Sequence, residues 1–455
     1  MHKAVNKTLL LMAVASVTTQ SALASDQSDS KGFLDGSSLT LTNRNFYMNR
    51  DYHDGYGNIR SADGSYRVGE TADAAPGEKT NGYRKEWAQA FILDYSSGFT
   101  QGPVGVGVDA YGFLGLKLDA GGGSGGNLLL PYGKNGPGDN ISDAGGSIKL
   151  RYSNTVLKYG EMYTDNPVFD TTTDWRLLPE TATGFQLTSS EVEGLKVQAG
   201  HFTALTSVNS SNSKDGIYFS YAAAAPADSV DFAGASYAWN SQFSTTLYAS
   251  NVEDAWHQVY TNLNFVQPIN STQSLMFDFN LYRTVDSGSS NLGQINNTTY
   301  SAAGSYTVGA HTFILSTQKV HGDTPFDYVG NDSIYLNNSS QYSDFNAPNE
   351  RSWALAYNLD MQNYGVPGLS FRTRYVRGSD IDGTHADPRG AYAGYYGDDG
   401  KHWERDIEAR YIVQSGPVKG LSTRLRQATH RANADQGEHN LDEVRLIVSY
   451  PLNIL

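Results

Sequence analysis

Hydrophobic and polar positions alternate along short segments of this chain, and the alternation is clearest near the C-terminus. The segment 445–450 places Leu, Val and Tyr on one face of an extended strand and Arg, Ile and Ser on the other. Five such segments occupy the last part of the chain, at 351–360, 369–376, 406–414, 421–430 and 441–450. Each has about the 9–11 residues that a tilted membrane-spanning strand needs. The pattern therefore predicts β-strands that cross a membrane.

The connections between these segments alternate in length. NYGVPG at 363–368 and SGPVKG at 415–420 are short, a Gly- and Asp-rich stretch at about 377–405 is long, and ANADQGEHN at 432–440 is intermediate. Short turns on one side and long loops on the other are typical of outer-membrane barrels. The whole chain has about nineteen candidate strands, of which the run at 214–222 is the weakest. Because single-chain bacterial barrels use even numbers of strands, we predict an all-β, antiparallel transmembrane barrel of about 18 strands. A soluble β-sandwich or β-helix is the alternative.

The first residues have a different pattern. Two lysines precede an apolar stretch at 9–17, and Ala-Leu-Ala at 22–24 has the small residues of a signal-peptide cleavage site. We expect residues 1–24 to be a cleaved signal peptide and residues 25–455 to form a single barrel domain. The predicted location is the bacterial outer membrane.

Composition narrows the possible functions. The 455 residues include no cysteine, which excludes thiol catalysis, disulfides and Cys-ligated metals. A formal net charge of −14 argues against general nucleic-acid binding, which needs a basic surface. The ten histidines show no HExxH spacing, and we expect no metal, no cofactor and no enzymatic activity.

Several arginines of the last strands alternate with apolar neighbours. They are Arg372, Arg374, Arg410, Arg424 and Arg426. An arginine on the lipid face near the middle of the membrane costs about 2–4 kcal/mol. Because five such costs would exceed the margin by which a protein is stable, we predict that all five face the lumen.

Arginine is also distributed unevenly along the chain. Eleven of the 19 arginines lie in the last 105 residues, whereas the stretch before them, back to position 177, contains only Arg283. Consecutive strands are neighbours in a barrel, so one wall should be basic, and Arg44 and Arg445 should join it where the first strand meets the last. Guanidinium groups on neighbouring strands can pass a carboxylate along by bidentate hydrogen bonds. The alternative is that they pair with lumenal acids such as Glu408 and Glu443.

Longer segments carry a family resemblance. They include GFLDGSSLTLTNRNFYMNRDY, GYRKEWAQAFILDYSSGFTQGPVGVGVDAYGFLGLKLD, NTVLKYGEM, SQYSDFN, NYGVPGLSFRTRYVRG and ATHRANADQGEHNLDEVRLIVSYPL. With these segments the mature chain resembles, over essentially its whole length, the OprD family of substrate-specific outer-membrane channels of pseudomonads. The resemblance implies an 18-stranded monomeric barrel, loops folded inward to form a narrow constriction, an arginine ladder on one wall and passive uptake of small carboxylate-bearing solutes.

The resemblance also implies roles for individual residues. The family's ladder corresponds to the five arginines predicted above to face the lumen. NPVFDTTTDWRLLPET corresponds to the constricting loop, so Asp174 and Arg176 are expected to line the narrowest part. HGDTPFDYVG corresponds to a second infolded loop and makes Asp323, Asp327 and Tyr328 candidate contacts for a positively charged substrate group. The alternative is that these three are loop residues that bind nothing.

We therefore expect a porin that lets small carboxylates diffuse passively along the arginine ladder, with basic amino acids and short peptides as the favoured solutes. Aromatic or other organic acids are the alternative substrates. A barrel enzyme and a non-conducting adhesin are more remote alternatives. The expected surroundings are outer-membrane lipid and lipopolysaccharide, with a monomer as the expected state and a trimer as the alternative.

Overall fold

The computed structural model describes residues 26–61, 63–68, 78–119, 121–133, 135–172, 175–222 and 225–455. The predicted signal peptide at 1–24 lies outside these residues and stays a prediction. In the described part of the chain, no helix is long and apolar enough to cross a membrane.

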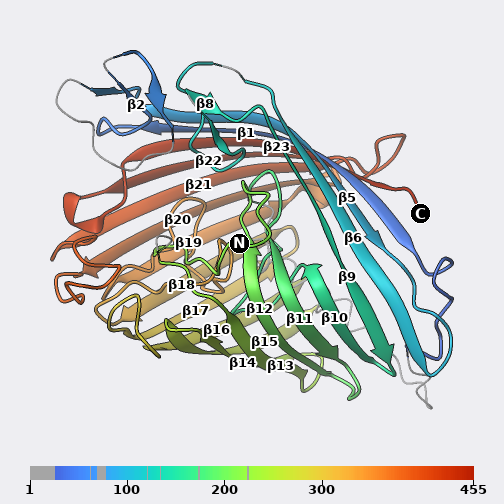
Figure 1. Ribbon diagram of the computed structural model, residues 1–455. Coiled ribbons are helices and arrows are strands. Elements are labelled where there is room, and N and C mark those ends of the chain that lie inside the picture. Colours follow the sequence, from blue (N-terminus) through green and yellow to red (C-terminus); the bar gives the residue numbers. More distant parts are fainter. Residues whose placement is uncertain are drawn as a thin grey trace.

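Eighteen strands form one sheet that closes on itself (Figure 1). The strands are β1 (Ser38–Tyr52), β5 (Tyr83–Ser96), β6 (Val104–Lys117), β9 (Asn140–Tyr152), β10 (Thr155–Met162), β11 (Thr181–Ser189), β12 (Leu195–Thr206), β13 (Val230–Ala238), β14 (Phe243–Val252), β15 (Trp256–Asn270), β16 (Gln273–Asp286), β17 (Asn296–Val308), β18 (His311–His321), β19 (Arg351–Asp360), β20 (Leu369–Ile381), β21 (Gly400–Ile412), β22 (Ser422–Ala432) and β23 (Leu441–Asn453). Smaller elements lie in the connections: β2 (Ile59–Arg60), β3 (Tyr66–Arg67), β4 (Lys79–Thr80), β7 (Tyr132–Gly133), β8 (Gly136–Pro137), η1 (Met361–Tyr364) and η2 (Ala434–Gln436).

Each barrel strand pairs in antiparallel fashion with its neighbours in the chain, and the ring closes between the two ends. β1 pairs with β23 from Thr40↔Asn453 to Tyr52↔Leu441. In Figure 1 the red β23 accordingly lies beside the blue β1. The predicted all-β antiparallel barrel and its strand number are confirmed.

The two rims of the barrel differ in the length of their connections. At one rim the connections are residues 97–103, 153–154, 190–194, 239–242, 271–272, 309–310, 361–368 and 413–421. At the other rim they are residues 53–82, 118–139, 163–180, 207–229, 253–255, 287–295, 322–350, 382–399 and 433–440. The rim with the short turns is the periplasmic one in barrels of this kind.

Some predicted boundaries were wrong. β20 continues to Ile381 and β21 already begins at Gly400, so the loop expected at about 377–405 shrinks to 382–399. The extra residues of β21 still alternate in burial, whereas in β20 the pairing register shifts between Gly378 and Ile381. The weak run at 214–222 forms only isolated bridges, at Ile217 and Phe219.

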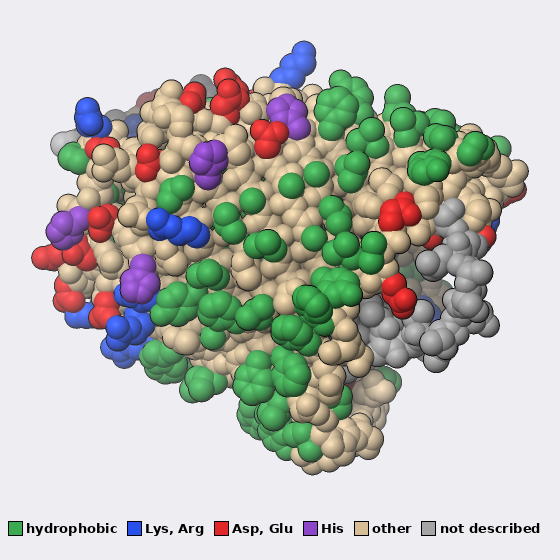
Figure 2. Space-filling model, turned by 90° about the horizontal axis from the view of Figure 1, so that it is seen from below, with side chains coloured by type: hydrophobic (Ala, Val, Ile, Leu, Met, Phe, Trp, Pro, Cys, Tyr) green, Lys and Arg blue, Asp and Glu red, His purple; other side chains and the backbone are tan. Residues whose placement is uncertain are grey.

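The outer wall is apolar and the interior is packed. Exposed apolar side chains cover the wall, for example Ile148, Leu247 and Leu315, each 56–60% exposed. Figure 2 shows such side chains spread over the wall, with the Lys, Arg and His side chains of this view mainly toward one end. This is the surface that a lipid bilayer requires of a spanning barrel.

Three connections fold into the lumen, and their apolar side chains bury themselves there. Leu129 and Leu130 come from 118–139, and Leu177 from 163–180; together they pack against the inner face of β1 and β5. Phe326, from 322–350, packs with apolar residues of β12–β16. We call 163–180 the constriction loop and 322–350 the second infolded loop. They narrow the lumen from within.

Candidate substrate pathway

The inner faces of β20, β21, β22, β23, β1 and β5 form one continuous wall, which we call the basic wall. Strand register arranges its side chains in three rows that run around the barrel. The row nearest the long loops consists of Arg374, Asp406, Ala428, Glu443, Arg50 and Arg84. The middle row consists of Arg372, Glu408, Arg426, Arg445, Met48 and Glu86. The row nearest the short turns consists of Ser370, Arg410, Arg424, Ile447, Phe46 and Ala88. All five arginines predicted to face the lumen therefore lie on the inner face.

The carboxylates of the basic wall are shared between arginines. Glu443 lies 2.5 Å from Arg445 Nε and 2.7 Å from Arg50 Nε. Glu408 Oε2 lies 3.1 Å from both Arg424 Nη2 and Arg426 Nε. The predicted pairing with Glu408 and Glu443 is thus present, but each carboxylate serves two guanidinium groups. Positive charge remains in excess on this wall.

Acids of the basic wall also hold the second infolded loop. Glu404 accepts hydrogen bonds from the backbone N–H groups of Tyr342 and Ser343, both at 2.8 Å. Glu443 also accepts from Gln341 Nε2 at 2.8 Å. The loop is therefore fixed against the basic wall by charge-assisted hydrogen bonds.

A cavity of about 1000 Å³ lies inside the barrel beside this wall. The arginines that line it are Arg50, Arg84, Arg176, Arg424, Arg426 and Arg445. Arg50 and Arg84 were not among the predicted residues, although Arg50 follows Arg44 at an even spacing of six residues on the same strand. That spacing places both side chains on the inner face and was the signal that could have identified Arg50.

Four of the predicted ladder arginines are not among the residues that line this cavity. Arg374 donates to the carbonyl of Asn337 at 2.5 Å, and Arg410 Nε lies 3.4 Å from Ser422 Oγ. Arg44 donates from Nη1 to the carbonyl of Arg176 at 3.0 Å, so it supports the constriction loop. Arg372 faces Glu408 across the pair of β20 and β21.

The constriction loop places a cation at the cavity. Arg176 lines the cavity and its guanidinium stacks on the ring of Trp175, 3.6 Å from the ring centroid. Burial lowers the pKa of Arg176, and the positive charges of Arg445 and Arg50 lower it further. A neighbouring anion would relieve this repulsion. Asp174, the other residue predicted in this loop, lies outside the described residues.

The second infolded loop differs from the prediction in its acids. Tyr328 lines the cavity as expected, but Asp323 and Asp327 are not among its lining residues. Asp323 is exposed, and Asp327 is buried, accepting from the N–H groups of Tyr221 and Tyr328 and from Tyr392 Oη at 3.0, 2.7 and 3.1 Å. Without a nearby cation, burial raises the pKa of Asp327 to about 7.

Different acids line the cavity in their place. They are Asp165, Asp332, Asp344 and Glu438. Asp344 already accepts from Tyr328 Oη at 2.7 Å and from Tyr221 Oη at 3.0 Å, and Asp165 is exposed. The sequence pattern did not identify these acids, because the conformation of a long loop decides which of its carboxylates reach the lumen.

The inner faces of β14, β15 and β16 form a second wall, which we call the amide wall. It lies halfway around the ring of strands from β23 and β1. Its polar side chains bind one another: Tyr260 Oη donates to Asn280 at 2.6 Å, and Asn262 and Asn264 donate to Asp278 at 3.1 and 3.0 Å. A basic wall thus faces a nearly neutral one.

A closed barrel with an apolar outer wall and a polar lumen crossed by charged rows is the architecture of an outer-membrane channel. Comparisons with known proteins identify the family. Residues 31–454 match the model of the outer membrane porin, OprD family. The chain belongs to the OprD family and is an outer-membrane porin.

Relatives agree with this assignment over nearly the full length. The chain is 49% identical to Porin D of Pseudomonas aeruginosa, with 98% of each chain covered. The crystal structure of OprD from the same species is similar at a TM-score of 0.79 and 48% identity, covering 96% of this chain and all of that one. The structure of Pseudomonas aeruginosa OpdK with vanillate is also similar, at a TM-score of 0.79 and 35% identity, covering 93% of this chain and all of that one. These relatives are channels and not enzymes.

Proposed function

We propose that this porin is a passive channel selective for small solutes with a carboxylate group, and that the basic wall recognises the carboxylate. One observation carries the proposal: Glu408 pairs with the guanidinium groups of both Arg424 and Arg426 and lies opposite Arg372 in the strand register. Two of these arginines line the cavity. A passing carboxylate would meet an excess of positive charge here, on guanidinium groups whose planar shape suits bidentate hydrogen bonds.

The row nearest the short turns adds a second binding position for the same solute. Arg410 and Arg424 are direct neighbours across β21 and β22, and the other residues of that row are uncharged. Several moderate sites in series favour conduction, because a single strong site would hold the solute. The rows therefore support transfer from the level of Arg426 to that of Arg410.

Arg424→Ala tests the proposal, with Arg405→Ala as the matched control on the outer face of β21. A hydrogen bond to a charged group contributes about 1.5–3 kcal/mol, so benzoate uptake into liposomes should fall about tenfold in Arg424→Ala. Uptake of neutral benzamide should change less than about twofold, since the pore itself remains. Equal losses for benzoate and benzamide, or the same loss in Arg405→Ala, would contradict carboxylate recognition.

Within this class, basic amino acids and short peptides are the proposed solutes. A solute with a carboxylate at the basic wall can place a positive group near Asp165 and Asp332, which line the same cavity. The double substitution of both aspartates by Asn should slow arginine uptake several-fold and leave benzoate uptake unchanged. Equal effects on both solutes would remove these acids from selectivity.

Aromatic acids are the second candidate. Tyrosines line much of the cavity: Tyr52, Tyr56, Tyr221, Tyr248, Tyr260, Tyr328, Tyr335, Tyr342 and Tyr395. The relative OpdK was crystallised with vanillate, an aromatic carboxylate. Competition between arginine and benzoate for uptake separates the candidates, because the better solute inhibits the other at the lower concentration.

A further inference from the structure

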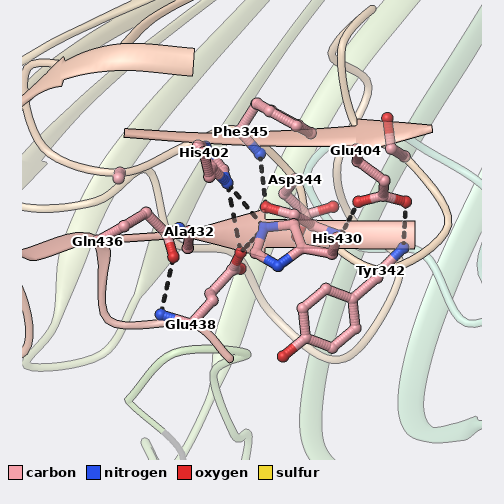
Figure 3. A network of polar contacts seen from close by, with 12 residues as sticks. Tyr342, Asp344, Phe345, His402, Glu404, His430, Ala432, Gln436 and Glu438 are labelled. Carbon is pink, nitrogen blue, oxygen red and sulfur yellow. Dashed lines mark hydrogen bonds and ion pairs between the residues drawn. The ribbon is translucent and has the colours of Figure 1, made fainter. Parts of the chain in front are cut away.

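Two histidines and a glutamate meet where the second infolded loop touches the upper part of the basic wall (Figure 3). His402 Nδ1 lies 3.0 Å from His430 Nε2, and Glu438 Oε2 lies 3.6 Å from the first and 3.2 Å from the second. The circle through these three atoms has a radius of about 1.9 Å, and three ligands of a tetrahedral zinc site, at bonds of about 2.0–2.1 Å, lie on a circle of about the same size.

The remaining ring nitrogens fix the tautomer of each histidine. His402 Nε2 lies 2.7 Å from Glu350 Oε1, and His430 Nδ1 lies 2.9 Å from the carbonyl oxygen of His439. Both partners are acceptors, so these two nitrogens carry the hydrogens. The nitrogens that face each other then present lone pairs, and the Glu438 carboxylate faces the same point. When both rings are neutral, three acceptors converge on one point, which suits a cation.

This arrangement matches the outer shell of protein metal sites. A metal-binding histidine usually donates its other N–H to a carboxylate or a backbone carbonyl, which orients the ring and raises its basicity. Here Glu350 and the carbonyl of His439 supply one of each. Both rings are fully buried, and Phe345 stacks on His402 with ring centroids 4.1 Å apart.

The convergence point lies beside the lumen, although the Glu438 oxygen that faces it is itself buried. Glu438 and its neighbours Gly437 and His439 line the large cavity. The three ligands come from β21, β22 and the loop 433–440. An ion at this point ties that loop to the barrel wall beside the segment that carries Tyr342 and Phe345.

We propose that His402, His430 and Glu438 bind a divalent transition-metal ion, with Zn²⁺ as the best match for two imidazoles and one carboxylate, and with a water from the lumen as the fourth ligand. The histidine spacing alone predicted no metal site. The pairing of β21 with β22 brings the two rings together across 28 residues of sequence. The ion has a structural role and takes part in no reaction.

Titration of the chelator-treated, untagged barrel in detergent with ZnCl₂ tests the proposal. Wild-type protein should bind one Zn²⁺ per chain, Glu438→Gln should weaken binding at least tenfold, and His430→Gln should abolish it. Glu350→Gln, which removes the partner of His402, should weaken binding about 10–100-fold. His201→Gln is the control, since His201 contacts Asp231 at 2.8 Å elsewhere on the barrel; its affinity should equal wild type.

Two results would overturn the proposal. One is wild-type protein that binds no Zn²⁺, with a proton shared between the two imidazoles instead. The other is equal affinity in wild type and Glu438→Gln. Because Glu438 lies in a loop, this variant decides the question even if His430→Gln fails to fold, and heat-modifiable electrophoretic mobility reports folding of each variant. Visible absorption of bound Co²⁺ should show a tetrahedral site in wild type and lose intensity in Glu438→Gln.

Discussion

The basic wall and the amide wall lie on opposite sides of one lumen and satisfy their polar groups differently. On the amide wall, polar side chains pair mainly with one another, as Tyr260 does with Asn280 and as Asn262 does with the Asp278 carboxylate. On the basic wall, Glu443 and Glu408 are each shared between two arginines, and Glu443 also binds the second infolded loop. One wall carries few charges, whereas the other carries more guanidinium groups than carboxylates.

The difference shows how one barrel combines stability with selectivity. A wall whose polar groups pair mainly with one another contributes stability and little recognition. On a wall with shared carboxylates, the loss of one carboxylate lowers stability, because the buried guanidinium groups that it served then remain unpaired. The predictions below test this contrast.

Glu443→Gln should have the largest effect. Arg445 and Arg50 would both lose their buried partner, so the free energy of unfolding should fall by about 5 kcal/mol, the upper end of the range for breaking a buried ion pair. Urea unfolding in lipid measures this. Asp278→Asn on the amide wall is the comparison and should cost less, because it leaves no buried guanidinium group without a partner. Equal losses would mean that the walls do not differ as described.

Asp327 should make stability depend on pH. Burial raises its pKa to about 7, above the value of about 3.9 in an unfolded chain. The folded protein therefore holds a proton that the unfolded chain has lost, and the free energy of unfolding should fall by roughly 4 kcal/mol as the pH rises from 4 to 7. It should stay constant above this range.

Asp327→Asn should remove this contribution. The difference between the two proteins in urea unfolding, measured from pH 4 to 8, isolates it from other titrating groups. Identical pH profiles for the two proteins would show that burial does not raise the pKa of Asp327. This contrasts with Glu443, whose carboxylate lies between two guanidinium groups.

Arg410→Ala should reduce carboxylate uptake about tenfold, corresponding to the loss of about 1.5 kcal/mol of interaction. Carboxylate uptake by Arg410→Lys should lie between that of wild type and that of Arg410→Ala, since lysine keeps the charge and loses the planar pair of donors. Liposome uptake of a carboxylate and of its amide is the measurement. If both solutes slowed alike, Arg410 would affect the pore shape and not carboxylate recognition.

Thr246→Ala should have the smallest effect. Thr246 lines the cavity on the amide wall, where its hydroxyl lies 2.9 Å from that of Ser236. Loss of one neutral hydrogen bond costs about 1 kcal/mol, and carboxylate uptake should stay within about twofold of wild type. A tenfold loss here would place substrate recognition on both walls.

The barrel and the faces of its arginines could be predicted because both follow from short-range rules. Alternation with a period of two places Arg372 and Arg424 inward, and the cost of arginine in lipid excludes the other face. Consecutive pairing of strands then gathers the C-terminal arginines on one wall. Closure adds Arg44, which pairs in register with Ser449.

The interior of the lumen could not be predicted in the same way. Long loops have no periodicity, so the sequence did not distinguish Asp327, which is buried, from Asp165, which lines the cavity. His402 and His430 meet because of the register between β21 and β22. The distance between the two histidines along the sequence does not reveal this register. Tertiary packing decides these positions.

The pairing of β1 with β23 has a consequence for how the chain can be redesigned. Thr40 and Asn453 are partners at the rim with the short turns, so the start of β1 and the end of β23 lie side by side there. A short peptide can therefore join them. New ends could be opened in the short connection 253–255, which joins β14 and β15 halfway around the ring. Every strand of the basic wall then stays uninterrupted. A circularly permuted barrel of this kind would carry its arginine rows on six strands that are consecutive in sequence.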